Sequence, residues 1–94
     1  PVHIDLGRRN AFAHGRLLTL TDRELDLLAY LARRDGQLVT RAELVEQVWP
    51  AGEVVANVIE VHISRLRDKL GEESKLIQTV RGQGYRFDST GRHG

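Results

Sequence analysis

The sequence predicts an α+β domain in which a small antiparallel sheet comes first, three helices follow and a β-hairpin closes the fold. Alternating apolar and polar residues open the chain, as in a half-buried strand. Helix-start signatures, each followed by an apolar periodic run, fill the middle. Two strand-like segments divided by glycines come near the end. All 94 residues are taken as one domain, since this length supports a single core.

Residues 1–20 are expected to form the N-terminal sheet. VHIDL, residues 2–6, places three apolar side chains on one face and two polar ones on the other. Gly7 and the pair His14-Gly15 punctuate the segment. Residues 10–13 and 17–20 are therefore the candidate partner strands.

Residues 21–70 are expected to form a core of three helices. In a capping box, the cap side chain accepts from the third helical N–H and a Glu reaches back to the cap N–H. Three residue pairs match it: Thr21 with Glu24, Thr40 with Glu43, and Asn57 with Glu60. The predicted helices cover residues 22–34, 41–49 and 58–70, with a short extended link at 37–39.

The third predicted helix has two distinct faces. Its core face is a narrow apolar stripe made of Ile59, Ile63, Leu66 and Leu70. Its second face mixes small apolar side chains with potential cations: Val58, Val61, His62, Arg65 and Lys69. A generic solvated face would alternate Glu and Lys, so this one is expected to meet a partner that is apolar in places and negative overall.

The distribution of charge also favours a polyanionic partner. Residues 1–61 hold seven basic and nine acidic side chains, whereas residues 62–94 hold seven basic and four acidic ones. The balance therefore changes from −2 to +3 toward the end of the chain.

Composition excludes several other functions. The chain has no cysteine, which rules out disulfides and thiolate metal sites and fits a reducing, cytoplasmic location. Its histidines lack metal-ligand spacing, so neither a metal nor a cofactor is expected. No nucleophile motif or paired-carboxylate motif is present, which argues against an enzyme. The longest apolar run, residues 27–32, is too short to span a bilayer, and no leader is recognised, so no membrane association is expected.

The segment QTVRGQGYRF, residues 78–87, predicts a hairpin with Arg81-Gly82-Gln83-Gly84 at its tip, within a wing that spans residues 76–88. A helix pair whose second member is cationic, followed directly by a hairpin, is a winged helix-turn-helix. A helix fits the DNA major groove, and an arginine on a thin turn can enter the neighbouring minor groove. The alternative is a winged helix used for protein–protein contact, since fold alone does not fix function.

Four segments carry a resemblance to a known family: LTLTDRELDLLAYL, RAELVEQVW, NVIEVHISRLRDKL and LIQTVRGQGYRF. Together they resemble the C-terminal DNA-binding domain of OmpR/PhoB-type response regulators, over essentially the whole chain. The resemblance implies a four-stranded N-terminal sheet, three helices and a wing. It also implies a preceding receiver domain, which agrees with the absence of methionine and suggests a fragment of a longer protein.

The resemblance further implies roles for individual residues. In the third helix, Val58, Val61 and Arg65 would face base edges, and Asn57, His62 and Arg67 would approach phosphates. In the wing, Thr79, Gly82 and Tyr85 would contact the DNA backbone and Arg81 the minor groove. The loop from Trp49 to Ala56, which includes Pro50, Gly52 and Glu53, corresponds to a segment that contacts RNA polymerase. Binding to tandem direct repeats is also implied.

Two departures and several alternatives qualify these roles. Pro50 stands where the family often has glycine, and Ser64 stands where it often has a basic residue. Val58 and Val61 could be core residues instead of partners for thymine methyl groups. Trp49 could be a packing anchor, and His62 could be a solvated surface residue.

Overall fold

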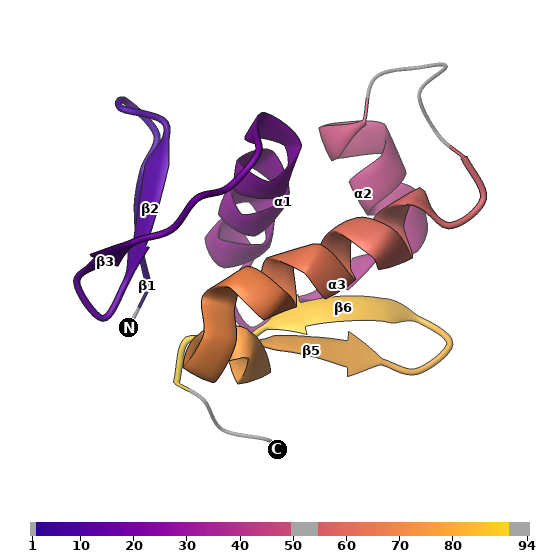
Figure 1. Ribbon diagram of the computed structural model, residues 1–94. Helices are drawn as coiled ribbons and strands as arrows, with labels where there is room; N and C mark the ends of the chain where they lie inside the picture. The colour runs from indigo at the N-terminus through magenta and orange to yellow at the C-terminus, as the bar shows by residue number, and fades with distance from the viewer. Residues whose placement is uncertain (1, 50–54, 91–94) are drawn as a thin grey trace.

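A computed structural model describes residues 2–49 and 55–90. The elements follow the predicted order: β1 (Val2–Asp5), β2 (Asn10–Ala13), β3 (Arg16–Leu17), α1 (Asp22–Arg33), β4 (Leu38–Thr40), α2 (Arg41–Val48), α3 (Val58–Leu70), the 3-10 helix η1 (Gly71–Leu76), β5 (Ile77–Val80) and β6 (Gly84–Phe87). The N-terminal sheet lies beside α1, α3 crosses the front of the domain, and the β5–β6 hairpin lies beneath it (Figure 1). The predicted fold class is confirmed.

The N-terminal sheet is antiparallel and has the order β1-β2-β3. Val2 pairs with Ala13, and Phe12 pairs with Leu17 in the short third strand. After Leu17 one further backbone bond forms, from the Leu18 N–H to the Ala11 carbonyl at 2.9 Å. Leu18 then turns into the core, and the chain leads directly to α1. The described residues therefore form three strands here, not the four that the resemblance implies, and the predicted strand 17–20 is shortened.

Only the first of the three predicted capping boxes is complete. In α1 the Thr21 hydroxyl accepts from the Glu24 N–H at 3.2 Å, and the Glu24 carboxylate accepts from the Thr21 N–H at 2.9 Å. In α2 the Thr40 hydroxyl accepts from the Glu43 N–H at 3.0 Å. The Glu43 carboxylate, however, accepts from Tyr30 and Arg34.

The third predicted capping box is absent. The Asn57 side chain makes no cap hydrogen bond, and the Glu60 carboxylate accepts from Arg41 of α2 at 2.8 Å. A charged donor makes a stronger hydrogen bond than a neutral backbone N–H, so it outcompetes the cap for the carboxylate. The helix nevertheless begins at Val58, as predicted.

The core lies between α1, α3 and the two sheets. The predicted apolar stripe of α3 is buried throughout, with Ile59 and Leu66 at 0% exposure. Leu27, Leu28 and Leu31 of α1 are equally inaccessible. Apolar periodicity thus predicted which face of α3 packs inward.

The wing belongs to a second three-stranded sheet with the order β4-β6-β5. The predicted extended link is β4, which pairs with β6 through Val39 and Tyr85. Between α3 and β5 the chain forms the 3-10 helix η1. Because β4 runs directly into α2 at Arg41, the sheet fixes the start of α2 relative to the wing.

Candidate nucleic-acid interface

The exposed face of α3 is the most accessible helical surface near the wing. At about 100° per residue, Ser64, Arg65 and Asp68 fall on the side away from the core stripe and Glu60 falls on its flank, and all four are exposed. Asn57 is exposed directly before the helix, and Val61 is half-buried on the same side. This surface offers cationic, anionic, amide, hydroxyl and apolar groups within a few turns.

His62, one helical turn after Val58 on α3, contacts the Trp49 ring at the end of α2. Val58 is only 8% exposed and lies in the core cluster, which corrects the expectation that it faces base edges. His62 Nδ1 lies 2.8 Å from the Val58 carbonyl oxygen, and its ring meets Trp49 edge-on at a centroid distance of 5.0 Å. Trp49 is 5% exposed, so it is a packing anchor.

Arg67 connects α3 to the wing. Its Nε and Nη2 atoms donate to the Ile77 carbonyl at 3.1 and 2.8 Å, and Nη2 also donates to the Thr79 hydroxyl at 2.9 Å. Burial lowers the pKa of Arg67. The ordinary pKa of an arginine is so high that the guanidinium still stays charged. These bonds occupy the face of the guanidinium that meets β5, so Arg67 holds the helix and the hairpin in a fixed relation.

Lys69 lies on the side of α3 that meets α1. Its ammonium nitrogen is 2.6 Å from Glu24 Oε1, and the Glu24 side chain is 2% exposed. Burial alone would raise the pKa of Glu24, but hydrogen bonds from Lys69 and the Thr21 N–H lower it. Lys69 thus neutralises a buried carboxylate at the start of α1.

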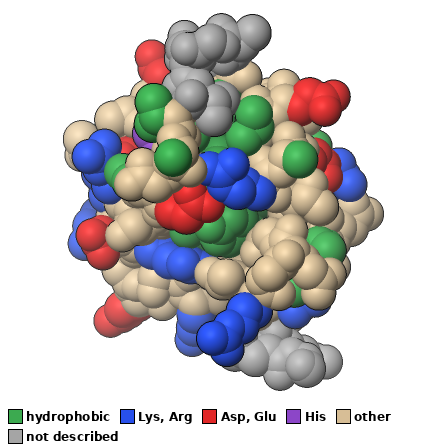
Figure 2. Space-filling model, turned by 90° about the vertical axis from the view of Figure 1, so that its right-hand side faces the viewer, with side chains coloured by type: hydrophobic (Ala, Val, Ile, Leu, Met, Phe, Trp, Pro, Cys, Tyr) green, Lys and Arg blue, Asp and Glu red, His purple; other side chains and the backbone are tan. Residues whose placement is uncertain are grey.

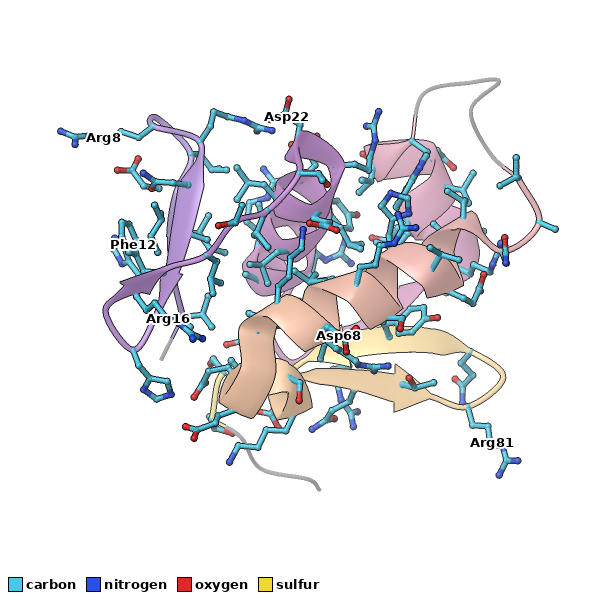
Figure 3. The ribbon with its side chains drawn as sticks, in the orientation of Figure 1. Arg8, Phe12, Arg16, Asp22, Asp68 and Arg81 are labelled. Carbon is cyan, nitrogen blue, oxygen red and sulfur yellow. The ribbon has the colours of Figure 1, made fainter. Side chains whose placement is uncertain are left out.

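The wing tip is a tight turn that carries a free cationic side chain. The Gln83 N–H donates to the Val80 carbonyl at 2.9 Å, and Gly82 takes the left-handed φ of 73° that this turn requires. Arg81 is exposed and projects away from the body of the domain (Figure 3). The predicted tip is therefore present, although Gly84 belongs to β6 and not to the turn.

A groove with a volume of about 300 Å³ separates α3 from the wing. Arg41 and Glu60 line its helical side, and Thr79, Gly82 and Tyr85 line its wing side. Figure 2 looks at the side of the domain that carries the wing tip, where acidic and basic side chains meet over an apolar hollow. Burial, with the Glu60 carboxylate nearby, raises the pKa of Tyr85, so its hydroxyl stays a neutral donor.

A larger hollow of about 390 Å³ lies at Leu6, between the N-terminal sheet and the helices α1 and α2. Its Arg9 is bound to Asp26 at 2.9 Å, and its Arg33 guanidinium lies over the Tyr30 ring, 5.7 Å from the centroid. The groove beside the wing is the better candidate for a polyanion because Arg81, between the lining residues Val80 and Gly82, is exposed and matched by no described acid.

Some predicted site residues lie outside the described part of the chain. Pro50, Gly52 and Glu53 of the expected polymerase-contact loop are among them. Among the described residues, no group of His, Cys, Asp or Glu could hold a metal ion. No helix in that part of the chain has both the length and the apolar character to cross a membrane.

Sequence reasoning missed Arg41 and the role of Glu60. Arg41 Nε donates to Glu60 Oε2 at 2.8 Å, and its Nη2 donates to the Ala56 carbonyl at 2.6 Å. Both hydrogen bonds join residues that are 15 or more positions apart, so no short sequence pattern indicates them. In the sequence, the spacing of Asn57 and Glu60 matched a capping box, so the ion pair between Glu60 and Arg41 was not expected.

A helix with an exposed mixed face, fixed to a hairpin with a cationic tip, defines the class of winged-helix DNA-binding domains. The model of the family described as "Transcriptional regulatory protein, C terminal" matches residues 15–87. The chain belongs to this family and is an effector domain of the OmpR/PhoB type, not an enzyme.

Three similar proteins illustrate the relationship. RegX3 of Mycolicibacterium smegmatis, a sensory transduction protein, is 38% identical over 92 residues, which are 94% of this chain and 40% of RegX3. The RstA DNA-binding domain of Klebsiella pneumoniae, solved with its RstA box, is 32% identical with a TM-score of 0.81, over 93% of this chain and 90% of that one. DrrB of Thermotoga maritima, an OmpR/PhoB homologue, is 30% identical with a TM-score of 0.85, over 94% and 42%. The chain thus spans well under half of its full-length relatives.

Proposed function

We propose that this domain binds double-stranded DNA sequence-specifically, with α3 in the major groove and the wing in the adjacent minor groove. The observation that carries the proposal is the rigid connection, through Arg67, between the exposed face of α3 and a hairpin whose tip presents Arg81. A helix of this width fits the major groove, where base edges carry distinct donor and acceptor patterns. An arginine on a narrow turn suits the negative potential of the minor groove.

The contacts are assigned by exposure and by existing bonds. Val61 and Arg65 contact base edges, while Asn57, the outer edge of His62, Thr79 and Gly82 contact the DNA backbone. Tyr85, which is mostly buried but lines the groove beside the wing, contacts the backbone from there. Arg81 enters the minor groove. Val58, Arg67 and Lys69 support the interface from within, because the first is buried and the other two are engaged with Ile77 and Glu24.

The surrounding protein is proposed to be a two-component transcriptional regulator in the cytoplasm, where its DNA lies. In it, a receiver domain precedes the chain, and two copies bind tandem direct repeats. One module of this size buries only about 600–1,000 Å² on DNA, so a second copy one helical turn away would raise affinity. The loop after Trp49 is proposed as the contact for RNA polymerase.

A selection experiment tests the proposal directly. The domain is immobilised, a pool of random duplexes is passed over it at moderate salt, and the retained DNA is sequenced. Enrichment of a short motif, in particular a repeat spaced by one helical turn, is the expected result. Retention without a motif would reduce the function to non-specific backbone binding. A lack of retention would favour the alternative of a winged helix that binds protein.

Arg65→Ala is expected to weaken binding to the selected site by about 1–3 kcal/mol and to relax the base preference at one position. The exposed guanidinium can bind guanine bidentately, and alanine cannot. Binding constants on the site and on its single-base variants measure the effect. Arg8→Ala removes the same charge from an exposed side chain of the β1–β2 turn and serves as the control. A loss that is equal on every sequence would make Arg65 a phosphate contact.

Arg81→Ala is expected to weaken binding and to lower the slope of log affinity against log salt by about one unit. The reason is that one fewer cation displaces counterions from the DNA. Arg8 and Arg81 project from opposite ends of the domain (Figure 3), so Arg8→Ala again serves as the control. An unchanged slope in Arg81→Ala would remove the wing tip from the interface.

A further inference from the structure

The two ring nitrogens of His62 have different surroundings. Nδ1 lies 2.8 Å from the carbonyl oxygen of Val58, one helical turn earlier on α3. Nε2 has no hydrogen-bond partner among residues 2–49 and 55–90, which are the ones that the structure describes. The side chain is half-buried, so part of the ring remains accessible. Nε2 is therefore the nitrogen that is left for a partner outside the domain.

The bond to Val58 fixes where the proton of a neutral ring lies. A carbonyl oxygen only accepts hydrogen bonds, so Nδ1 carries a hydrogen and donates it. A neutral imidazole has a single N–H, so Nε2 then holds a lone pair and can only accept. The phosphate oxygens of DNA are acceptors as well, and two acceptors repel each other. A neutral His62 in this tautomer therefore has no donor to offer to a phosphate.

Protonation removes this conflict. In the imidazolium form both ring nitrogens donate, so His62 keeps its bond to the Val58 carbonyl and presents a second, charged N–H at Nε2. A charge-assisted hydrogen bond to a phosphate oxygen is roughly twice as strong as a neutral one. Histidine is also the side chain whose charge ordinarily changes between pH 5 and 8. A contact between His62 and the DNA backbone thus calls for one additional proton.

The groups that α1 and α2 bring to this ring offer no negative charge. The Trp49 ring at the end of α2 contacts His62 at a centroid distance of 5.0 Å. Arg23 of α1 lies over the same indole, 5.7 Å from its centroid, and its guanidinium is 3.9 Å from the carboxylate of Asp26. The charged group that shares Trp49 with His62 is thus a cation, which cannot serve as a counter-charge for an imidazolium.

On α3 itself, the charged side chains that follow His62 on the same side of the helix are also basic. Arg65 is exposed one turn further on. Lys69, two turns further on, is paired with Glu24 of α1 at 2.6 Å. In the described part of the chain no acid is paired with His62. A phosphate of the bound DNA would therefore supply the counter-charge that the protonated ring needs.

We propose that His62 contacts the DNA backbone as an imidazolium, so that the domain takes up a proton when it binds DNA. The proton is then a co-ligand of the complex, and acidification tightens binding. This inference rests on the proposed function, which brings the outer edge of His62 to the DNA backbone. It adds the protonation state in which that contact forms and the pH dependence that results.

The direction of the pH dependence follows from the linkage between proton and DNA binding. Where the ring of the free domain is already protonated, DNA affinity does not change with pH. At higher pH each binding event must take a proton from the solvent, so log affinity decreases with pH, with a limiting slope of about −1. Between pH 6 and 8 we expect an overall loss of affinity of about fivefold.

The test measures binding to the selected DNA site from pH 6 to 8.5 at constant ionic strength. Titration calorimetry in buffers of different ionisation enthalpy counts the protons directly, and uptake of between about half a proton and one proton per domain is expected at pH 7. The slope of log affinity against log salt should also be steeper at pH 6 than at pH 8.5, by up to about one unit, because one more cation then neutralises a phosphate.

His62→Gln is the decisive variant. Its amide keeps a donor that does not titrate, so both the proton uptake and the pH dependence of affinity should disappear. His3→Gln is the matched control, because His3 is an exposed histidine on β1 of the N-terminal sheet. It should keep the wild-type pH profile. Since slopes are compared, a uniform weakening of His62→Gln through its contact with Trp49 leaves the result readable.

The outcomes separate this inference from the proposed function. A wild type that selects no DNA motif would overturn the proposed function first. A wild type that binds its site equally well at pH 6 and pH 8.5, without proton uptake, would overturn only the role of His62. A pH dependence that persists in His62→Gln would also overturn it, because another group would then take up the proton.

Discussion

Gly84→Ala is expected to destabilise the domain by about 3 kcal/mol or more, because overpacking and backbone strain act together. Gly84 is the first residue of β6 and has a φ of 155°. A Cβ there would lie 2.2 Å from the Val39 carbonyl oxygen and 2.8 Å from the Thr40 Cα. Both are backbone atoms of β4, so no side-chain rotation can relieve the clash. The sheet must separate or the wing must shift.

Chemical denaturation and thermal unfolding measure this effect. For a domain of this size, a loss of that magnitude corresponds to a fall in melting temperature of roughly 15 °C. Gly82→Ala is the control, because Gly82 also has a positive φ, of 73°, but no atom lies within 4 Å of its would-be Cβ. It should cost only about 1–2 kcal/mol, the penalty for the left-handed conformation. Equal losses in the two variants would show that conformation, and not the close approach of β4, makes Gly84 necessary.

The requirement at Gly84 marks the limit of what the sequence could predict. Two glycines separated by one residue indicated a turn, and the turn is present. No local pattern indicated that β4, more than 40 residues earlier, would approach the second glycine. The contact arises because the hairpin accepts a third strand, which is a tertiary event that local turn chemistry does not encode.

Helix faces were predictable because they depend on a periodicity that is local. The stripe Ile59, Ile63, Leu66 and Leu70 is buried as predicted, and α3 has the predicted bounds. The burial of Val58 was harder to predict, since a residue at the edge of the apolar stripe can face either the core or the solvent. In the structure Val58 is buried, and the Trp49 ring that caps α2 contacts His62, one helical turn further along α3.

Charged side chains were the least predictable part of the candidate site. The cationic residues of α3 formed one group in the sequence, but the fold divides them among different partners. Arg67 binds β5, Lys69 binds Glu24 from 45 residues away, and Arg65 remains exposed. A helical projection gives the direction of a side chain, but the partner it meets depends on elements that are distant in sequence.

Lys69→Met is expected to destabilise the domain by about 2–3 kcal/mol at neutral pH. Breaking a buried ion pair leaves an uncompensated charge, which costs about 3–5 kcal/mol when burial is complete. Here Glu24 is 2% exposed and Lys69 is 36% exposed, so water compensates part of the loss and the lower value applies. Lys75→Met, which removes an exposed lysine from η1, is the control and should be nearly neutral.

The effect of Lys69→Met should depend on pH in a defined direction. In the wild type the pKa of Glu24 is lowered, because hydrogen bonds from Lys69 and Thr21 outweigh burial. Its contribution to stability is therefore present above the unfolded pKa, about 4.3, and is lost as pH falls through the folded value. Without Lys69, burial remains and the folded pKa is expected to rise above the unfolded one. In the variant, Glu24 is therefore tolerated when it is protonated at low pH, and it destabilises the fold as pH rises and the buried carboxyl must ionise. The difference in stability between the two proteins should be large at pH 7 and small near pH 3.

A second substitution at Glu24 distinguishes an ion pair from simple packing of the lysine stem. If the loss in Lys69→Met comes from the bare carboxylate, combining it with Glu24→Gln should recover part of the stability, because an amide needs no counter-charge. Additive losses in the double variant would instead attribute the effect to packing. The slope of DNA affinity against salt should be unchanged in Lys69→Met, because its ammonium group is engaged with Glu24. A lower slope would return Lys69 to the DNA interface, so the same variant tests both the core of the domain and the boundary of its binding surface.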